Sequence, residues 1–147
     1  RPQNTLVMQS VIFDTNVLLD LFVFNDFRAI HLKQALLDQK IDALASSTTL
    51  EEFADVISRP LFALDADAQK NIFHQWKSHA RILEENVLIK APWECRDNDD
   101  QIFLDLAFTT KPCFLITKDH EILKLANRAA PTCVLITSDY NAINPDL

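Results

Sequence analysis

The sequence predicts an α/β fold of three layers, in which a parallel sheet of about five strands is flanked by helices. Segments with the pattern of strands and of helices alternate along the 147 residues, as they do where helices cross over between parallel strands. The expected strands are continuously apolar, which is typical of a sheet covered on both faces. This length and alternation favour a single domain over residues 1–147, with flexible tails at 1–5 and 140–147.

The strands are predicted from short apolar runs bounded by polar residues. The first strand ends in Val11-Ile12-Phe13, directly before Asp14, and the fourth contains Cys113-Phe114-Leu115-Ile116. The five expected strands span residues 7–13, 41–46, 87–89, 113–117 and 133–137.

The helices are predicted from apolar residues that recur three or four positions apart. The longest is expected over residues 67–85, and Pro60 ends the helix before it because proline cannot continue a helix. The apolar positions of the long helix are Ile72, Phe73, Trp76, Ala80 and Leu83. The six expected helices span residues 17–24, 27–39, 49–58, 67–85, 99–109 and 121–128.

The chain contains no glycine. This absence excludes a P-loop, a dinucleotide-binding fingerprint and an EF-hand, because each requires glycine for a left-handed turn or a close backbone approach. Left-handed backbone positions are therefore expected at Asn or Asp, for example at Asn86 and Asn127.

The net charge is −7, from 14 basic and 21 acidic side chains, which argues against bulk attraction to nucleic acid or to an anionic membrane. It does not exclude an enzyme that acts on nucleic acid, because a site built from carboxylates is negative until metal ions bind. The three cysteines do not form a zinc or disulfide pattern, and the longest apolar runs are too short to cross a bilayer. We therefore expect a cytoplasmic protein with no membrane partner.

Each expected crossing from a strand to a helix carries a carboxylate near its start. These acids are Asp14, Glu51, Glu52, Asp97, Asp99, Asp100 and Asp119. Because the carboxyl ends of parallel strands lie at one edge of a sheet, the acids can converge there.

A converging cluster of carboxylates predicts a site for a hard divalent cation. Like charges in one cleft repel one another, and Mg²⁺ or Mn²⁺ relieves that repulsion through the oxygen ligands these ions prefer. Such ions can hold a phosphodiester, activate a water and stabilise the leaving oxygen. The helix N-termini at the same edge add positive partial charge toward a phosphate.

Helix capping is the alternative explanation for the same residues, because Asp, Ser and Thr are favoured at helix N-termini for local reasons. Asp14 and Asp119 fit simple caps. The segment Thr49-Leu50-Glu51-Glu52 fits a capping box in which Glu52 returns to the Thr49 amide. The ordered recurrence of acids after successive strands favours the metal site.

The motifs around these acids resemble those of the PIN-domain nucleases, and within them the toxin subgroup of type II toxin–antitoxin systems. The matching segments follow the family's order and spacing over nearly the whole chain. They are Val11-Ile12-Phe13-Asp14-Thr15-Asn16-Val17-Leu18, Glu51-Glu52-Phe53 with Ser58-Arg59-Pro60, Cys95-Arg96-Asp97-Asn98-Asp99-Asp100 with Phe103-Leu104 and Leu106-Ala107, and Leu115-Ile116-Thr117-Lys118-Asp119. The family implies a five-stranded parallel sheet and an endoribonuclease that depends on Mg²⁺ or Mn²⁺.

The resemblance assigns roles to individual residues. The catalytic, metal-holding acids that it implies are Asp14, Glu52, Asp100 and Asp119. Asp97 and Asp99 are close enough in sequence to help, and the choice of Asp100 over Asp99 stays open. The supporting polar residues that it implies are Thr15, Asn16 and Thr117.

Basic residues flank the acidic loops and are candidates for contacts with the substrate phosphate. They are Arg59, Arg96 and Lys118. Lys118 also departs from the family, which usually has a small residue before the fourth acid. The resemblance further implies RNA as the substrate, an antitoxin protein as a partner, and a homodimer or higher homo-oligomer.

Three other functions stay open. A phosphohydrolase of the haloacid-dehalogenase type requires a second Asp two residues after the first, where this chain has Asn16. A receiver-type signalling domain requires a Lys after its last strand, which Thr137-Ser138-Asp139 does not supply. A PIN-like domain that is non-catalytic, or that processes RNA, would share all four acids, and metal-dependent cleavage of RNA separates cutting from binding.

Overall fold

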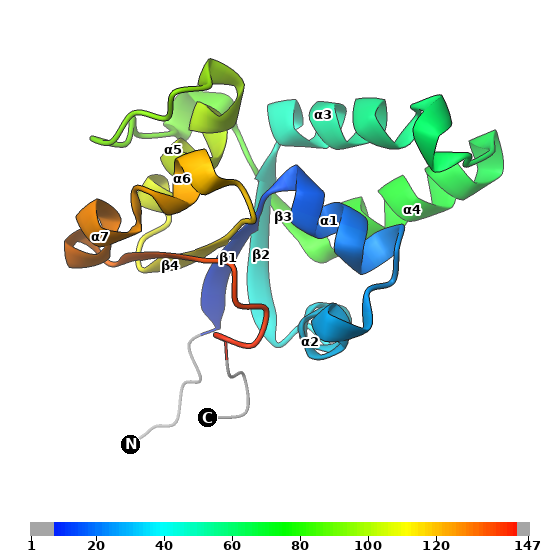
Figure 1. Ribbon diagram of the computed structural model, residues 1–147, viewed down its shortest axis with the longest axis horizontal. Coiled ribbons are helices and arrows are strands. Elements are labelled where there is room, and N and C mark those ends of the chain that lie inside the picture. The colour runs from blue at the N-terminus through cyan, green and yellow to red at the C-terminus, as the bar shows by residue number, and fades with distance from the viewer. Residues whose placement is uncertain (1–7, 144–147) are drawn as a thin grey trace.

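The computed structural model describes residues 8–143, which form a five-stranded, all-parallel sheet between two layers of helices (Figure 1). The strand order is β3-β2-β1-β4-β5, so the first strand lies at the centre. The strands are β1 (Gln9–Phe13), β2 (Ile41–Ser46), β3 (Ala80–Leu83), β4 (Cys113–Ile116) and β5 (Val134–Thr137). The predicted fold class is confirmed.

Helices connect each strand to the next across the faces of the sheet. They are α1 (Thr15–Phe22), α2 (Ile30–Leu37), α3 (Ser47–Ile57), α4 (Ala66–His79), α5 (Gln101–Thr109), α6 (His120–Leu123) and α7 (Ala126–Ala129). Short 3-10 turns lie at Phe27–Ala29, Pro60–Phe62, Glu85–Val87, Asn98–Asp100 and Ala130–Thr132. Among residues 8–143, every helix is too short or too polar to span a bilayer.

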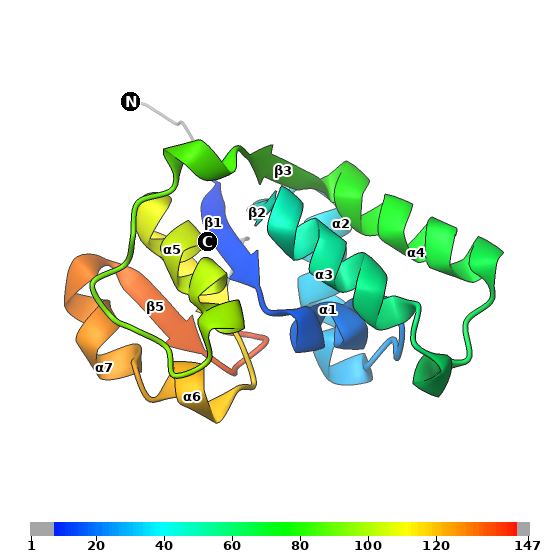
Figure 2. The ribbon, with the colours of Figure 1, turned by 90° about the horizontal axis from the view of Figure 1, so that it is seen from above.

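Two hydrophobic cores lie on opposite faces of the sheet. Successive side chains of a strand point to opposite faces, so Val11 and Phe13 of β1 enter one core and Ile12 enters the other. The first core is covered by α1 to α4 and the second by α5 to α7, as the view from above shows (Figure 2). Trp76 of α4 is buried in the first core, with its ring edge-on to Phe13 at 5.8 Å between centroids.

The third strand differs from the prediction. It begins at Ala80, directly after α4, and not at residues 87–89; the helix expected over 67–85 accordingly ends at His79. Ala80 and Leu83 continue the helical spacing from Trp76, so the apolar pattern did not distinguish helix from strand. Ala80 instead adopts an extended backbone and pairs with Ala43 of β2, whereas Val87 and Ile89 are about half exposed, at 54% and 51%.

Because β3 ends at Leu83, a long connection separates it from the third group of acids, which is Asp97, Asp99 and Asp100. The connection follows α5 in an extended path, in which the Ala91 amide donates to Asp105 Oδ1 at 2.9 Å and the Cys95 amide donates to Gln101 Oε1 at 2.7 Å. Trp93 is buried in the second core with Ala91 and Cys95. The third acidic group is therefore held at the start of α5 by contacts with that helix and not by a preceding strand.

The left-handed positions also differ from the prediction. Asn86 lies in a 3-10 turn and Asn127 lies in α7, so both are helical. Among residues 8–143, the positive φ angles fall at Asn25 (47°), Gln39 (58°), Ala63 (52°) and Cys133 (69°). Asn25 alone among these fits the expected residue types.

The expected tail at residues 1–5 lies outside the described residues. Residues 144–147 of the expected tail at 140–147 also lie outside them. Tyr140 and Ile143 are buried against the first core. Residue 7, where the first strand was expected to begin, also lies outside the described residues.

Candidate functional site

The candidate site lies at the carboxyl ends of β1 and β4, the adjacent strands at the centre of the sheet. From β1 the chain continues outward to β2 and β3, and from β4 it continues the other way to β5. In open parallel sheets, such a reversal of the strand order leaves a crevice beyond the carboxyl ends of the two strands. Asp14 follows β1 directly, and its amide donates to Ile116 O of β4 at 3.0 Å.

Asp14 is almost fully buried, with 5% of its surface exposed. Although it precedes α1, its side chain makes no capping hydrogen bond of normal geometry. Its Oδ2 instead accepts a hydrogen bond from the Thr117 hydroxyl at 2.7 Å. Burial raises the pKa of the Asp14 carboxyl above its ordinary value, Thr117 opposes this, and nearby Asp119 raises the pKa further.

Thr117 joins two of the acids. It is fully buried between them, and its hydroxyl donates to Asp14 while accepting from the Asp119 amide at 3.0 Å. Asp119 in turn caps α6, because its Oδ1 accepts from the Glu121 amide at 2.9 Å. The supporting role predicted for Thr117 therefore has a concrete geometry.

Asp100 is the most strongly perturbed carboxyl of the site. It precedes α5 without making a capping hydrogen bond. Burial, contact with the Asp119 carboxylate and the charge of Asp14 together raise the pKa of Asp100 to about 7. Asp97 adds to this shift in the pKa of Asp100, but it is exposed and its side chain caps the next turn by accepting from the Asp99 amide at 2.9 Å.

Glu52 reaches the same group of acids from α3. Burial raises the pKa of Glu52, and the charges of Asp14 and Asp99 raise it further, while Thr15 and Arg59 lower it. Glu51 is exposed. Glu52 therefore lies within reach of the charges of Asp14, which follows β1, and of Asp99.

The capping box of α3 is formed by other residues than those predicted. The Ser46 amide donates to Thr49 Oγ1 at 2.9 Å, and the Thr49 amide donates to Ser46 Oγ at 3.3 Å. Glu52 is therefore not occupied in capping. Capping accounts for Asp97 and Asp119, and it does not account for Asp14, Glu52 or Asp100.

Thr15 and Asn16 follow Asp14 at the start of α1. Thr15 is buried, and its hydroxyl makes no hydrogen bond of normal geometry although it lies close enough to Glu52 to lower that group's pKa. Asn16 is exposed, and its amide lowers the pKa of Asp14. The buried, unsatisfied hydroxyl is a polar group still lacking a partner within residues 8–143.

The donor chemistry of the site fits a hard divalent cation. The groups that perturb one another are carboxylates, with the Thr15 hydroxyl beside them, and oxygen donors of this kind suit Mg²⁺ and Mn²⁺. Burial is the largest cause of the raised pKa values of Asp14, Glu52 and Asp100, and neighbouring carboxylates raise these pKa values further. Within residues 8–143, however, no three or more Asp, Glu, His or Cys side chains are drawn into a tight metal-ligand cluster.

The three candidate phosphate contacts have different surroundings. Arg59 pairs with Asp55 one helical turn away, at 3.2 Å. Lys118 extends away from the acids, and its Nζ donates to Asp20 Oδ2 at 2.7 Å. Arg96 is exposed.

Sequence reasoning missed Asp20 and Tyr140, which contact Lys118 or its partner. Asp20 is 4% exposed on α1 and accepts hydrogen bonds from both Lys118 and the Tyr140 hydroxyl. The sequence signal for Asp20 was its place as a carboxylate inside the apolar segment 17–22. That signal indicates a buried acid but does not indicate its hydrogen-bond partners.

Comparison with known protein families gives one match, to the PIN domain over residues 10–121. No curated protein and no solved structure matches the chain significantly. The matched range begins within β1 and ends just after Asp119, so it contains all four acids that the sequence analysis singled out. Because the match covers most of the sequence and the sheet has the order and helical cover expected of that fold, the chain belongs to the PIN-domain family, whose members are generally nucleases.

Proposed function

We propose that the chain is a metal-dependent endoribonuclease that hydrolyses phosphodiester bonds of RNA. The observation that carries this proposal is that burial and neighbouring carboxylates raise the pKa values of Asp14 and Asp100 where the order of the strands reverses. The neighbour of Asp14 is Asp119, and the neighbours of Asp100 include both Asp119 and Asp14. Perturbed carboxyl groups in such a crevice are typical of functional sites. Membership of a family of nucleases supports the same reaction class.

The residues that would hold Mg²⁺ or Mn²⁺ are Asp14, Asp100 and Asp119, with Glu52 sharing the ion or holding a second one. A bound divalent cation would stabilise negative charge on the phosphoryl oxygens and make an attacking water more acidic. Asp97 and Asp99 lie at the rim of this group and add to its negative charge.

The chain's own residues fix the positions of these acids. Thr117 holds the Asp14 carboxylate through one hydrogen bond and holds the backbone of Asp119 through another. In the proposed reaction the oxygen of a water bonds to phosphorus while the bond from phosphorus to the 3′ oxygen breaks. The departing oxygen takes a proton, and the products carry a 5′-phosphate and a 3′-hydroxyl.

The test is cleavage of a labelled single-stranded RNA with Mg²⁺ or Mn²⁺, with and without EDTA. We expect cleavage that EDTA abolishes and that Asp14→Asn lowers by at least about a hundredfold, because the substitution removes a charged ligand from the centre of the site. Asp38→Asn is the matched control, since Asp38 is an exposed carboxylate at the opposite edge of the sheet. Cleavage that survives EDTA, or full activity of Asp14→Asn, would contradict the proposal.

We further propose that this activity is that of a cytoplasmic toxin with an antitoxin partner, and that the protein self-associates. The support is the resemblance to the toxin subgroup together with an exposed apolar surface next to α1 and α2. This surface contains Phe24, Phe27 and Ile30, which are 58%, 81% and 60% exposed. Large exposed apolar patches mark sites of protein association.

Induced expression tests the toxin proposal. We expect growth arrest with the wild-type chain and none with Asp14→Asn at equal protein level, and light scattering of the purified protein should give more than the monomer mass of 16.8 kDa. Normal growth with an active nuclease would rule out the toxin role and leave the nuclease proposal standing.

A further inference from the structure

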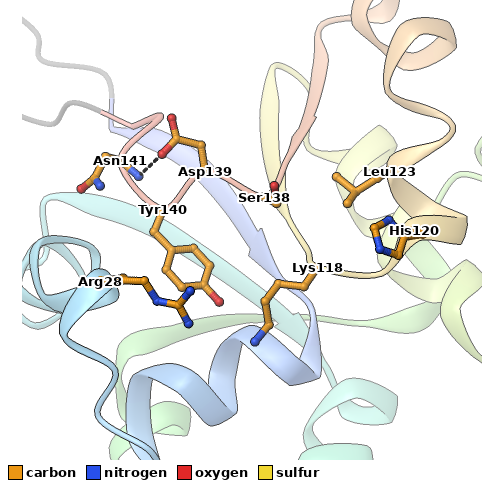
Figure 3. Close-up of a pocket in the computed structure, with 8 residues that line it drawn as sticks. All are labelled: Arg28, Lys118, His120, Leu123, Ser138, Asp139, Tyr140 and Asn141. Carbon is orange, nitrogen blue, oxygen red and sulfur yellow. Dashed lines mark hydrogen bonds between the residues drawn. The ribbon is translucent and has the colours of Figure 1, made fainter.

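A cavity opens where the turns after β4 and β5 meet (Figure 3). The Thr117 amide donates to Thr137 O at 3.0 Å, which sets these turns side by side. The cavity has a volume of about 480 Å³, within the roughly 300–1,000 Å³ of pockets that hold small ligands. Its lining includes Arg28, Lys118, Leu123, Asp139 and Tyr140.

The charges of this cavity argue against an anion as its occupant. Lys118 is paired with Asp20 at 2.7 Å, and Arg28 is paired with Asp26 at 2.6 Å. Asp139 adds a further carboxylate to the lining. Because each cation is already matched by an acid, the cavity has no excess positive charge with which to attract a lone phosphate.

The lining instead suits a neutral, flat and polar group. Leu123 and the ring of Tyr140 supply apolar surface, and Figure 3 shows the Tyr140 ring between Arg28 and Lys118. Lysine and arginine carry more N–H donors than one ion pair uses. One oxygen of Asp139 accepts from the Asn141 amide at 2.9 Å, and a carboxylate has a second oxygen that can accept. Nucleobases combine flat faces with edges that donate and accept hydrogen bonds, which is how proteins read unpaired RNA.

The cavity adjoins the turn that carries one of the acids of the candidate site. Lys118 and His120 line it, and Asp119 lies between them in the chain and contacts Asp100. One short turn thus forms a wall of both the acidic site and the cavity. We propose that the cavity is a base-recognition pocket, which takes the nucleobase of an RNA nucleotide next to the cleaved bond; the inference rests on the proposed nuclease function for the identity of the strand.

Binding can be tested without cleavage. The probes are the four nucleoside 5′-monophosphates and ribose 5-phosphate, titrated into ¹⁵N-labelled protein and followed by two-dimensional NMR. We expect at least one nucleotide to bind about tenfold more tightly than ribose 5-phosphate, the scale of a base contact made through paired hydrogen bonds. Its shifts should centre on the amides of Ser138, Asp139 and Asn141. Equal affinity for all five probes, no binding, or shifts centred elsewhere would overturn the proposal.

Asp139→Asn tests whether the pocket reads the base. Asp139 is exposed, and the substitution keeps an oxygen for the Asn141 amide while replacing an acceptor by a donor. We expect the affinity order of the four nucleotides to change, and cut sites mapped on a mixed-sequence RNA to change at one position beside the cleaved bond. Asp38→Asn should keep both. An unchanged order and an unchanged cut-site profile would refute base reading by this pocket.

The two proposals fail in different ways. Metal-dependent cleavage with no base-selective binding would retain the nuclease and exclude the pocket. Base-selective binding at Asp139 without cleavage of any RNA would retain the pocket and exclude the nuclease.

Discussion

Replacing Asp100 by Asn is expected to stabilise the protein at alkaline pH. The pKa of Asp100 rises from an ordinary 3.8 to about 7 in the folded protein, first because of burial and then because Asp119 and Asp14 lie close to it. The folded protein therefore binds more protons than the unfolded chain between about pH 4 and 7. Stability must fall as pH rises through this range, since the folded-state pKa lies above the unfolded one.

The magnitude follows from the difference between the two pKa values. The change from 3.8 to about 7 corresponds to about 4 kcal/mol if it acts in full. Asp100 is only partly buried, so solvent screens the repulsion and we expect about 1–2 kcal/mol. An amide of the same shape carries no charge to repel Asp14 and Asp119, so Asp100→Asn should be more stable than the wild type by this amount at pH 8.

Urea unfolding in EDTA at a series of pH values between 4 and 8 measures the gap, which is the free energy of unfolding of Asp100→Asn minus that of the wild type. The gap should shrink as pH is lowered toward 4, where the wild-type carboxyl is protonated in the folded protein. Asp38→Asn, which changes an exposed carboxylate far from the site, should show no such pH dependence. A gap that is the same at every pH, or a variant less stable than the wild type at pH 8, would refute the placement of these three carboxyls near one another.

Three further predictions address the site and the backbone. Thr117→Val should cost about 1–3 kcal/mol of stability and lower cleavage, because the buried carboxylate of Asp14 loses its donor; Thr117→Ser should restore both in urea unfolding and cleavage assays. Mg²⁺ at a hundred times its Kd should stabilise the wild type by about 2.7 kcal/mol in thermal unfolding, and Asp14→Asn should abolish this effect. Gln39→Gly should stabilise by about 0.5–1 kcal/mol in urea, because Gln39 follows the C-cap of α2 with a φ of 58°, where glycine avoids a steric cost.

For each of these predictions, one outcome would contradict the physical reason given for it. Full activity of Thr117→Val would show that the Asp14 hydrogen bond does not position the acid. Equal stabilisation by Mg²⁺ in the wild type and in Asp14→Asn would place the ion elsewhere. Destabilisation by Gln39→Gly would mean that the side chain of Gln39 contributes more than the backbone conformation costs.

The fold could be predicted because its strongest signals are local. The buried strands at the centre of the sheet are continuous apolar runs, and β1 and β4 lie where those runs lie. The edge strand β3 has no such run, since Arg81 and Ile82 are exposed and the strand follows α4 without a loop. It is placed by pairing with β2 and by the ion pair of Arg81 with Asp42 at 2.8 Å, neither of which is visible in a one-dimensional pattern.

The acids and the supporting residue Thr117 were named from the sequence, but the pairs of atoms that hold them in place were not. The bond from Thr117 to Asp14 spans 103 residues, and the bond from Lys118 to Asp20 spans 98. Local spacing holds no information on such pairs. The prediction of the capping box was wrong for a related reason. Both Ser46 and Thr49 can begin a helix, and which of them does so depends on where β2 ends.

Lys118 directly precedes Asp119, and its ammonium is paired with an acid outside the candidate site. An ammonium directed into the crevice would neutralise Asp119 and compete with a divalent cation for the same oxygens. Asp20, buried on α1, accepts a hydrogen bond from Lys118 Nζ and another from the Tyr140 hydroxyl. Lysine at this position is thus compatible with a metal site only while an acid on α1 holds it away. Lys118 also lines the neighbouring cavity, so the ion pair that Asp20 makes with this lysine also helps to form the surface that we propose binds the base.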